Sequence, residues 1–155
     1  MAFFDNLKYE LQKHSVLTIL LIVNVSLFFI LNISTGIFHS AAITNFLTLP
    51  LNLSEFLFKP WTLLTYMFAH KDLGHLFYNI LLLYFTSKTF LNFLNEKKLV
   101  YVYIMSGLFG GITLLILSAI FPVNFASSFL LGASAAVIGI VASLAVYIPN
   151  LPVSL

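Results

Sequence analysis

Four apolar segments dominate this chain, and each is about long enough to cross a lipid bilayer as a helix. A membrane-spanning helix needs about 20 mainly apolar residues, because the hydrocarbon core is about 30 Å thick. The segments extend over about 16–38, 75–93, 99–121 and 127–148. Prolines that can end a helix without breaking it follow apolar runs at Pro122, Pro149 and Pro152. We therefore predict an all-α fold, a polytopic membrane helix bundle.

The composition agrees with a membrane environment. Apolar residues make up 61% of the chain and charged residues only 8%. A soluble core of this size would need a charged surface layer, which so few charges cannot provide. The net charge of +2 and the lack of a basic run give no indication of nucleic-acid binding. The chain has no cysteine, which excludes disulfides, thiolate catalysis and cysteine metal sites.

A long connection, about 40–74, separates the first two apolar segments. Its stretch from Leu47 to Trp61 mixes leucine, phenylalanine and tryptophan with proline and polar residues. Such a mixture suits a segment that lies at the depth of the lipid headgroups, where Trp61 would anchor it. The chain shows no internal repeat and no low-complexity linker, so we predict a single membrane domain over residues 1–155.

The distribution of lysines predicts the orientation of the bundle. With a cytoplasmic N-terminus, five of the seven lysines lie in the cytoplasm, namely Lys8, Lys13, Lys88, Lys97 and Lys98. Only Lys59 and Lys71 then lie outside, as the positive-inside rule favours. The 40–74 connection is then an outer loop, and the second and fourth segments both run from the outer to the inner side.

Three polar side chains of these segments point to chemistry within the membrane. His75 and Asn79 are four residues apart, so a helix places them on one face. Ser134 lies about seven residues into the fourth segment, roughly 10 Å below the surface at 1.5 Å per residue. Polar groups at that depth face a protein interior or a water-filled cavity. A serine nucleophile needs a general base, and an imidazole N–H and an amide can stabilise an oxyanion.

Each feature also has a packing interpretation. Ser134 lies between Gly132 and Gly139, and such small residues often mark helix-packing faces. His75 and Asn79 alone would suit an interhelical hydrogen-bonded pair. Metal ligation is disfavoured, because residues 70 and 75 of a helix point about 140° apart and no third ligand accompanies them. The glycines of the third segment at 107 and 111 are predicted to form a packing face.

The joint pattern resembles the rhomboid intramembrane serine proteases of bacteria. The stretch from Lys59 through Trp61 to His70, followed by His75 and Asn79, resembles their first outer loop and second helix. Gly-Ala-Ser-Ala-Ala-Val-Ile-Gly over 132–139 resembles the serine motif of their fourth helix. The resemblance extends over nearly the whole chain, from the first apolar segment to the last residue.

The resemblance implies a function and a role for each motif residue. Ser134 would be the nucleophile, His75 and Asn79 would stabilise the oxyanion, and His70 would be a structural histidine. It implies a serine–histidine dyad with no carboxylate, no metal and no cofactor, acting on transmembrane protein substrates. It also implies a bacterial inner membrane and a bundle of six helices, of which this chain contains four.

The sequence departs from the family pattern at three residues. The residue after the serine is usually glycine, whereas Ala135 adds a methyl group that can narrow the site. Arginine often follows the loop tryptophan, but Thr62 stands here, and Ile138 replaces a common aromatic residue. The family's general base lies on a sixth helix, and no histidine follows Ser134 in this chain. We therefore expect the native chain to continue with two more helices, and residues 1–155 alone not to hydrolyse peptides.

The sequence is also compatible with two functions other than proteolysis. A catalytically inactive rhomboid-like protein that binds transmembrane helices would explain Ala135 and the missing histidine. A small channel or transporter subunit would use His75 and Asn79 as a polar site in the middle of the membrane. The resemblance favours the serine endopeptidase over both.

Overall fold

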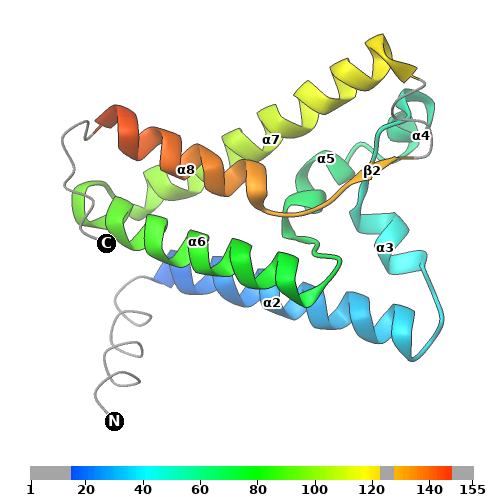
Figure 1. The fold of residues 1–155 in the computed structure, drawn as a ribbon, viewed down its shortest axis with the longest axis horizontal. Helices are drawn as coiled ribbons and strands as arrows, with labels where there is room; N and C mark the ends of the chain where they lie inside the picture. The colour runs from blue at the N-terminus through cyan, green and yellow to red at the C-terminus, as the bar shows by residue number, and fades with distance from the viewer. Residues whose placement is uncertain (1–14, 123–127, 148–155) are drawn as a thin grey trace.

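Four long helices form the bundle in the computed structural model, which describes residues 15–122 and 128–147 (Figure 1). They are α2 (Ser15–Gly36), α6 (Leu73–Phe93), α7 (Glu96–Ile120) and α8 (Ser134–Tyr147). Short elements between α2 and α6 are α3 (Ala42–Leu47), β1 (Leu49–Pro50), α4 (Leu53–Phe58), α5 (Thr62–Thr65) and the 3₁₀ helix η1 (Tyr66–Phe68). A second short strand, β2 (Phe129–Leu130), precedes α8. The mainly helical architecture that the sequence predicts is confirmed.

Two of these helices, α2 and α7, are long and apolar enough to cross a membrane by length and composition. Helix α6 has 21 residues and coincides with the predicted second segment. Helix α8 is apolar but has only 14 residues, which corresponds to about 21 Å at 1.5 Å per residue. That all four helices cross the membrane therefore stays a prediction.

The predicted start of the fourth segment, near residue 127, is wrong. The helix begins at Ser134, and the residues before it form an extended segment that pairs with β1. Leu130 lies opposite Leu49 in this antiparallel ribbon, and the N–H of Gly132 donates to the carbonyl of Tyr66 at 2.9 Å. Because these backbone groups bond to distant residues, they are not available for a helix. Ser134 therefore lies in the first turn of α8, and its depth does not follow from helix length.

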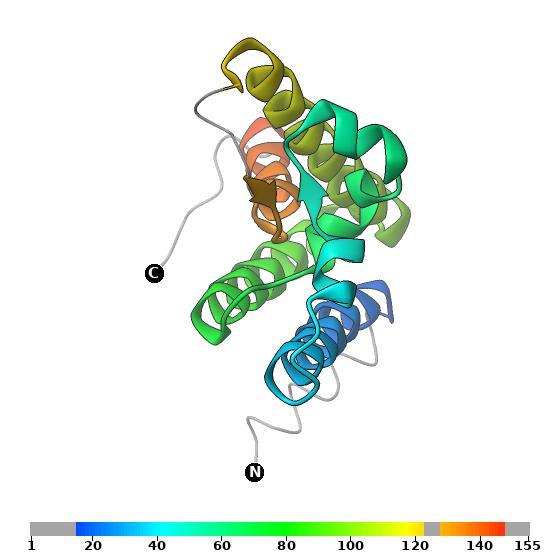
Figure 2. The same ribbon diagram turned by 90° about the vertical axis from the view of Figure 1, so that its right-hand side faces the viewer.

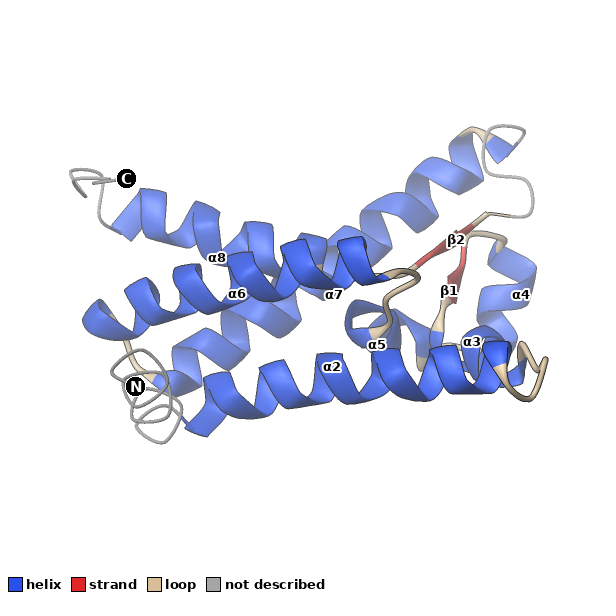
Figure 3. Ribbon diagram, turned by 60° about the horizontal axis from the view of Figure 1, so that its bottom comes forward, coloured by secondary structure: helices blue, strands red, loops and turns tan. Residues whose placement is uncertain are grey.

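The short elements gather at one end of the bundle, which we call the site end. It is the end at which α2 finishes and at which α6 and α8 begin (Figures 1 and 3). The indole N–H of Trp61 donates to the carbonyl of Phe46 at 3.0 Å, and the two rings lie 5.3 Å apart. Trp61 thus joins α3 to the start of α5. The predicted loop is therefore a folded layer of short helices.

Glycines bring α7 close to its neighbours. Helix α8 packs along α7 and against α6, and α2 packs against α6 (Figure 2). A Cβ added to Gly139 would overlap the side chain of Ser106, so α7 and α8 touch at this point. The predicted packing face on α7 is confirmed, although its partners belong to the site-end layer. Gly107 lies against Met67, and Gly111 lies against Leu63.

Candidate active site

His75 and Asn79 lie on the first turns of α6, where the sequence predicts them. The helix begins here because the side chain of Asp72 accepts the N–H of His75 at 2.8 Å, as an N-cap residue does. Asn79 is buried, and its Nδ2 donates to the carbonyl of His75 at 2.8 Å. An amide nitrogen has two hydrogens, so Asn79 keeps a second donor. The shared face of the two residues is confirmed.

The ring of His75 lies directly against the segment that leads to Ser134. A Cβ built on Gly132 would be 2.5 Å from Cε1 and 2.6 Å from Nε2 of His75, so only glycine leaves room for the ring. Gly132 also has a φ of 116°, a backbone conformation that suits glycine. The backbone of residue 132 therefore joins α6 to the start of α8. This contact brings the two predicted motifs together.

Ser134 is exposed in the first turn of α8. The helix begins here because the carbonyl of Ala133 accepts the N–H of Val137 at 2.9 Å. The N–H groups of a first turn have no partner within their helix, and the positive end of the helix dipole favours an anion beside them. Within residues 15–122 and 128–147, the hydroxyl of Ser134 forms no hydrogen bond with a histidine or with any other residue. The hydroxyl of Ser134 is exposed, and none of the described residues accepts a hydrogen bond from it.

The methyl group of Ala135 points toward α7, contrary to the expectation that it narrows the space beside Ser134. It faces α7, where a Cβ added to Gly110 would lie 2.6 Å from it. Gly110 therefore provides the space that Ala135 fills.

His70 supports the segment before Ser134 from the other side. It is only 1% exposed, and its Nε2 accepts the N–H of Ala133 at 3.5 Å. Its ring lies 5.0 Å from that of His75, so the expectation that the two histidines point apart is wrong. The reason is that α6 begins only at Leu73, so His70 is not part of the helix. The structural role that the resemblance implies for His70 stays a prediction. The described residues contain no group of three His, Cys, Asp or Glu that could hold a metal ion.

Burial, and then the positive charge of a protonated His75, lower the pKa of His70 from 6.5 to about 4. The ring is therefore neutral near pH 7, as an acceptor of the Ala133 N–H must be. Between pH 6.5 and 4 the unfolded chain binds a proton at this position that the folded chain does not. Stability contributed by the neutral ring is complete above pH 6.5 and decreases as the pH falls toward 4. Asp72 and His75 are the titratable groups that act on it.

We expect His70→Gln to weaken the pH dependence of stability in this range, because glutamine does not titrate and its oxygen can accept a hydrogen bond. The measurement is thermal unfolding in detergent between pH 4 and pH 7. His39→Asn is the control, because His39 is exposed and has a φ of 50°, which asparagine tolerates. Parallel curves of unfolding temperature against pH for wild type and His70→Gln would show that His70 does not cause this pH dependence.

Tyr66 is the site residue that the sequence did not single out. It is 1% exposed, its carbonyl accepts the N–H of Gly132, and its hydroxyl donates to the carbonyl of Gly107 at 2.6 Å. It thus connects α7 to the segment before Ser134. The only sequence signal was its position between Trp61 and His70. Trp61 and Gly139, by contrast, make the packing contacts described above.

Comparison with known proteins identifies one family. The family model described as Rhomboid domain matches residues 57–155. The match begins within α4 and includes both motifs, the histidine–asparagine pair of α6 and the serine segment of α8. No curated protein and no solved structure matches the chain.

Proposed function

The chain belongs to the rhomboid family of integral membrane proteins, and from this we propose that it is an intramembrane serine endopeptidase that cleaves transmembrane protein substrates. The observation that carries the proposal is the contact of the His75 ring with Gly132, two residues before the exposed Ser134. It places an imidazole, an amide and a hydroxyl on neighbouring helices. Metal ions and cofactors have no part in the proposed reaction.

Ser134 would attack the carbonyl carbon of a substrate peptide bond. Its proton passes to a general base, and the carbonyl oxygen becomes an oxyanion. His75, the second N–H of Asn79 and the backbone N–H of Ser134 are the donors that we assign to that oxyanion. The peptide bond then breaks, the amine leaves with the proton, and water hydrolyses the acyl-enzyme.

The general base is assigned to a histidine outside the described residues, following the family resemblance. His75 cannot easily be both base and oxyanion donor, because a base must be free of the proton that a donor presents. Labelling of the 155-residue chain by a fluorophosphonate probe tests this assignment. We expect no label on Ser134 when the chain is tested alone, and labelling would show that a base lies within it.

We expect Asn79→Ala and His75→Ala to lower kcat by about 10²–10³-fold each, the range measured when an oxyanion donor is removed. Substrate binding, and hence KM, should change much less. The measurement is cleavage of a transmembrane reporter by the full-length protein. Asn24→Ala is the matched control, because Asn24 is also buried and also donates to the carbonyl four residues before it. Equal losses of kcat in Asn24→Ala and Asn79→Ala would assign Asn79 a structural role.

We further propose that the N-terminus is cytoplasmic and that the site end faces the outer side of a bacterial inner membrane. The support is the lysine distribution, with Lys59 and Lys71 at the site end. Because the chain lacks cysteine, a single cysteine placed at Lys59 can be labelled selectively. If a membrane-impermeant thiol reagent added from outside does not label this cysteine, the proposed orientation is wrong.

A second candidate function is that of a catalytically inactive rhomboid that binds transmembrane helices. It is favoured by the fact that none of the described residues accepts a hydrogen bond from the hydroxyl of Ser134. Ala135 no longer supports it, because its methyl group packs against Gly110. Two results together would establish this function. A fluorophosphonate does not label the wild-type full-length protein, and membrane clients still co-purify with its Ser134→Ala variant.

A further inference from the structure

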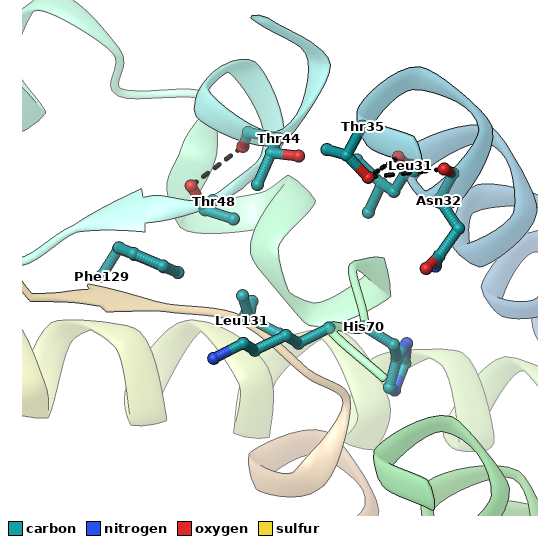
Figure 4. A pocket seen from close by; sticks show the side chains of 9 residues that line it. Leu31, Asn32, Thr35, Thr44, Thr48, His70, Phe129 and Leu131 are labelled. Carbon is teal, nitrogen blue, oxygen red and sulfur yellow. Dashed lines mark hydrogen bonds between the residues drawn. The ribbon is translucent and has the colours of Figure 1, made fainter. Parts of the chain in front are cut away.

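The segment that leads into Ser134, residues 131–133, borders unfilled space. A cavity of about 180 Å³ lies at the site end, and the side chains of Leu131 and His70 are among those that line it (Figure 4). Because protein interiors are otherwise close-packed, a segment beside such a space can shift without displacing a neighbour. The position of Ser134 therefore depends on the hydrogen bonds and contacts that hold this segment elsewhere.

Tyr66 accepts a hydrogen bond from the backbone of this segment. The N–H of Gly132 donates to the carbonyl of Tyr66 at 2.9 Å. The N–H of the next residue, Ala133, donates to Nε2 of His70 at 3.5 Å, which is long for such a bond. The carbonyl of Tyr66 is therefore the closer of these two acceptors, and it acts two residues before Ser134.

Tyr66 is itself fixed on α7. Its hydroxyl donates to the carbonyl of Gly107 at 2.6 Å, and the residue is only 1% exposed. Its ring lies against Gly111, where an added Cβ would be 3.1 Å from Cε1 of the ring. The side chain thus lies on a surface of α7 that glycines leave open. Because the side chain is held there, the backbone carbonyl that accepts the Gly132 N–H is held with it.

The hydroxyl of Tyr66 also lies where the residue after the serine packs. A Cβ added to Gly110 would be 3.4 Å from this hydroxyl oxygen and 2.6 Å from the Cβ of Ala135. Tyr66 and Ala135 therefore lie against the same residue of α7. Ser134 is thus held on both sides, by the bond of Tyr66 to Gly132 and by the contact of Ala135 with the glycine that Tyr66 adjoins.

We propose that Tyr66 is a positioning residue for the Ser134 nucleophile, an inference that rests on the proposed endopeptidase function. The bond from its hydroxyl to α7 fixes its carbonyl, and the carbonyl fixes Gly132. This connection sets where the Ser134 hydroxyl lies relative to His75 and Asn79. Tyr66 acts through the backbone and takes no part in the chemical steps.

The test compares Tyr66→Phe with Tyr103→Phe in the full-length protein. Tyr103 is the matched control, because it is also fully buried and its hydroxyl donates to the carbonyl of Met67 at 3.2 Å. That carbonyl is one residue beyond Tyr66 and is not the acceptor of the Gly132 N–H. Each variant keeps its ring and loses one buried hydroxyl that donates to a backbone carbonyl, so both should lose similar thermal stability.

We expect Tyr66→Phe alone to lower kcat for a transmembrane reporter, by up to about 10²-fold, the loss that a misplacement of about 1 Å can cause. KM should stay within about twofold, because the ground-state binding of substrate is unchanged. The rate at which a fluorophosphonate labels Ser134 should fall in parallel. Amide hydrogen exchange in the peptide that contains Gly132 should become faster. Tyr103→Phe should change none of these four quantities.

The outcomes separate this proposal from the proposed function. Unchanged kcat in Tyr66→Phe would overturn the positioning role, and so would equal losses of kcat in Tyr66→Phe and Tyr103→Phe, which would show a general effect of stability. Hydrogen exchange requires no catalysis. A wild-type protein that neither cleaves nor reacts with the probe would therefore overturn the proposed function, whereas unchanged exchange in Tyr66→Phe would overturn the connection through Gly132.

Discussion

Replacing Ser134 with alanine is expected to abolish cleavage of a transmembrane reporter by the full-length protein while leaving its fold intact. The activity should fall by roughly 10⁴-fold or more, because removal of a serine nucleophile eliminates the covalent route. The fold should survive, because the side chain is exposed and has no hydrogen-bond partner in the described part of the chain. Loss of activity would therefore report chemistry and not stability.

Ser143→Ala is the matched control for this experiment. Ser143 lies on the same helix, and its hydroxyl donates to the carbonyl of Ile140 at 2.7 Å. Its removal should affect stability slightly and cleavage not at all. Reporter cleavage, a fluorophosphonate label and thermal unfolding should be measured on the same preparations. Cleavage that persists in Ser134→Ala would remove Ser134 from the mechanism.

Replacing Gly132 with alanine is expected to be the most damaging single change at the site that leaves every proposed catalytic group in place. A φ of 116° is strained for alanine, by about 1–3 kcal/mol for backbone in such regions. The new methyl group would also overlap the ring of His75. Both effects displace the segment that positions Ser134, so we expect lower thermal stability and loss of cleavage together.

Two comparisons distinguish this explanation from a general effect of alanine. Gly36→Ala is the control, because a Cβ at Gly36 meets no atom within 4 Å, and it should change stability little. The second is the double variant Gly132→Ala/His75→Ala. If the ring causes part of the damage, the double variant should lose less stability than the sum of the single ones. Additive losses would mean that the His75 ring does not press on residue 132.

The long helices could be predicted from the sequence because local properties specify them. Apolar runs of spanning length placed α2, α6 and α7 to within a few residues of their observed bounds. Capping residues also contribute locally, as Asp72 does for α6 and Asn95 for α7. The start of α8 could not be placed this way, because the residues before Ser134 are as apolar as a helix. They form a strand since β1, about 80 residues earlier in the chain, offers them backbone partners.

The candidate site, too, could be predicted from the sequence only in part. The four-residue spacing of His75 and Asn79 requires them to share a face of any helix, and the residue types around Ser134 indicate its chemistry. Neither pattern specifies how far Ser134 lies from His75 and Asn79. This distance is set by Gly132, whose missing side chain admits the His75 ring, and by Tyr66, whose carbonyl holds the same glycine.

The sequence by itself thus determined the membrane-helix class, the family and the candidates for the reactive groups, because these follow from composition, periodicity and short motifs. Only the tertiary structure decided that His70 and His75 lie together, that Ser134 opens a helix, and that Ala135 faces Gly110. These arrangements depend on contacts between residues that are far apart in the chain. The side-chain volumes and backbone hydrogen bonds that create them take effect only when the helices are packed together.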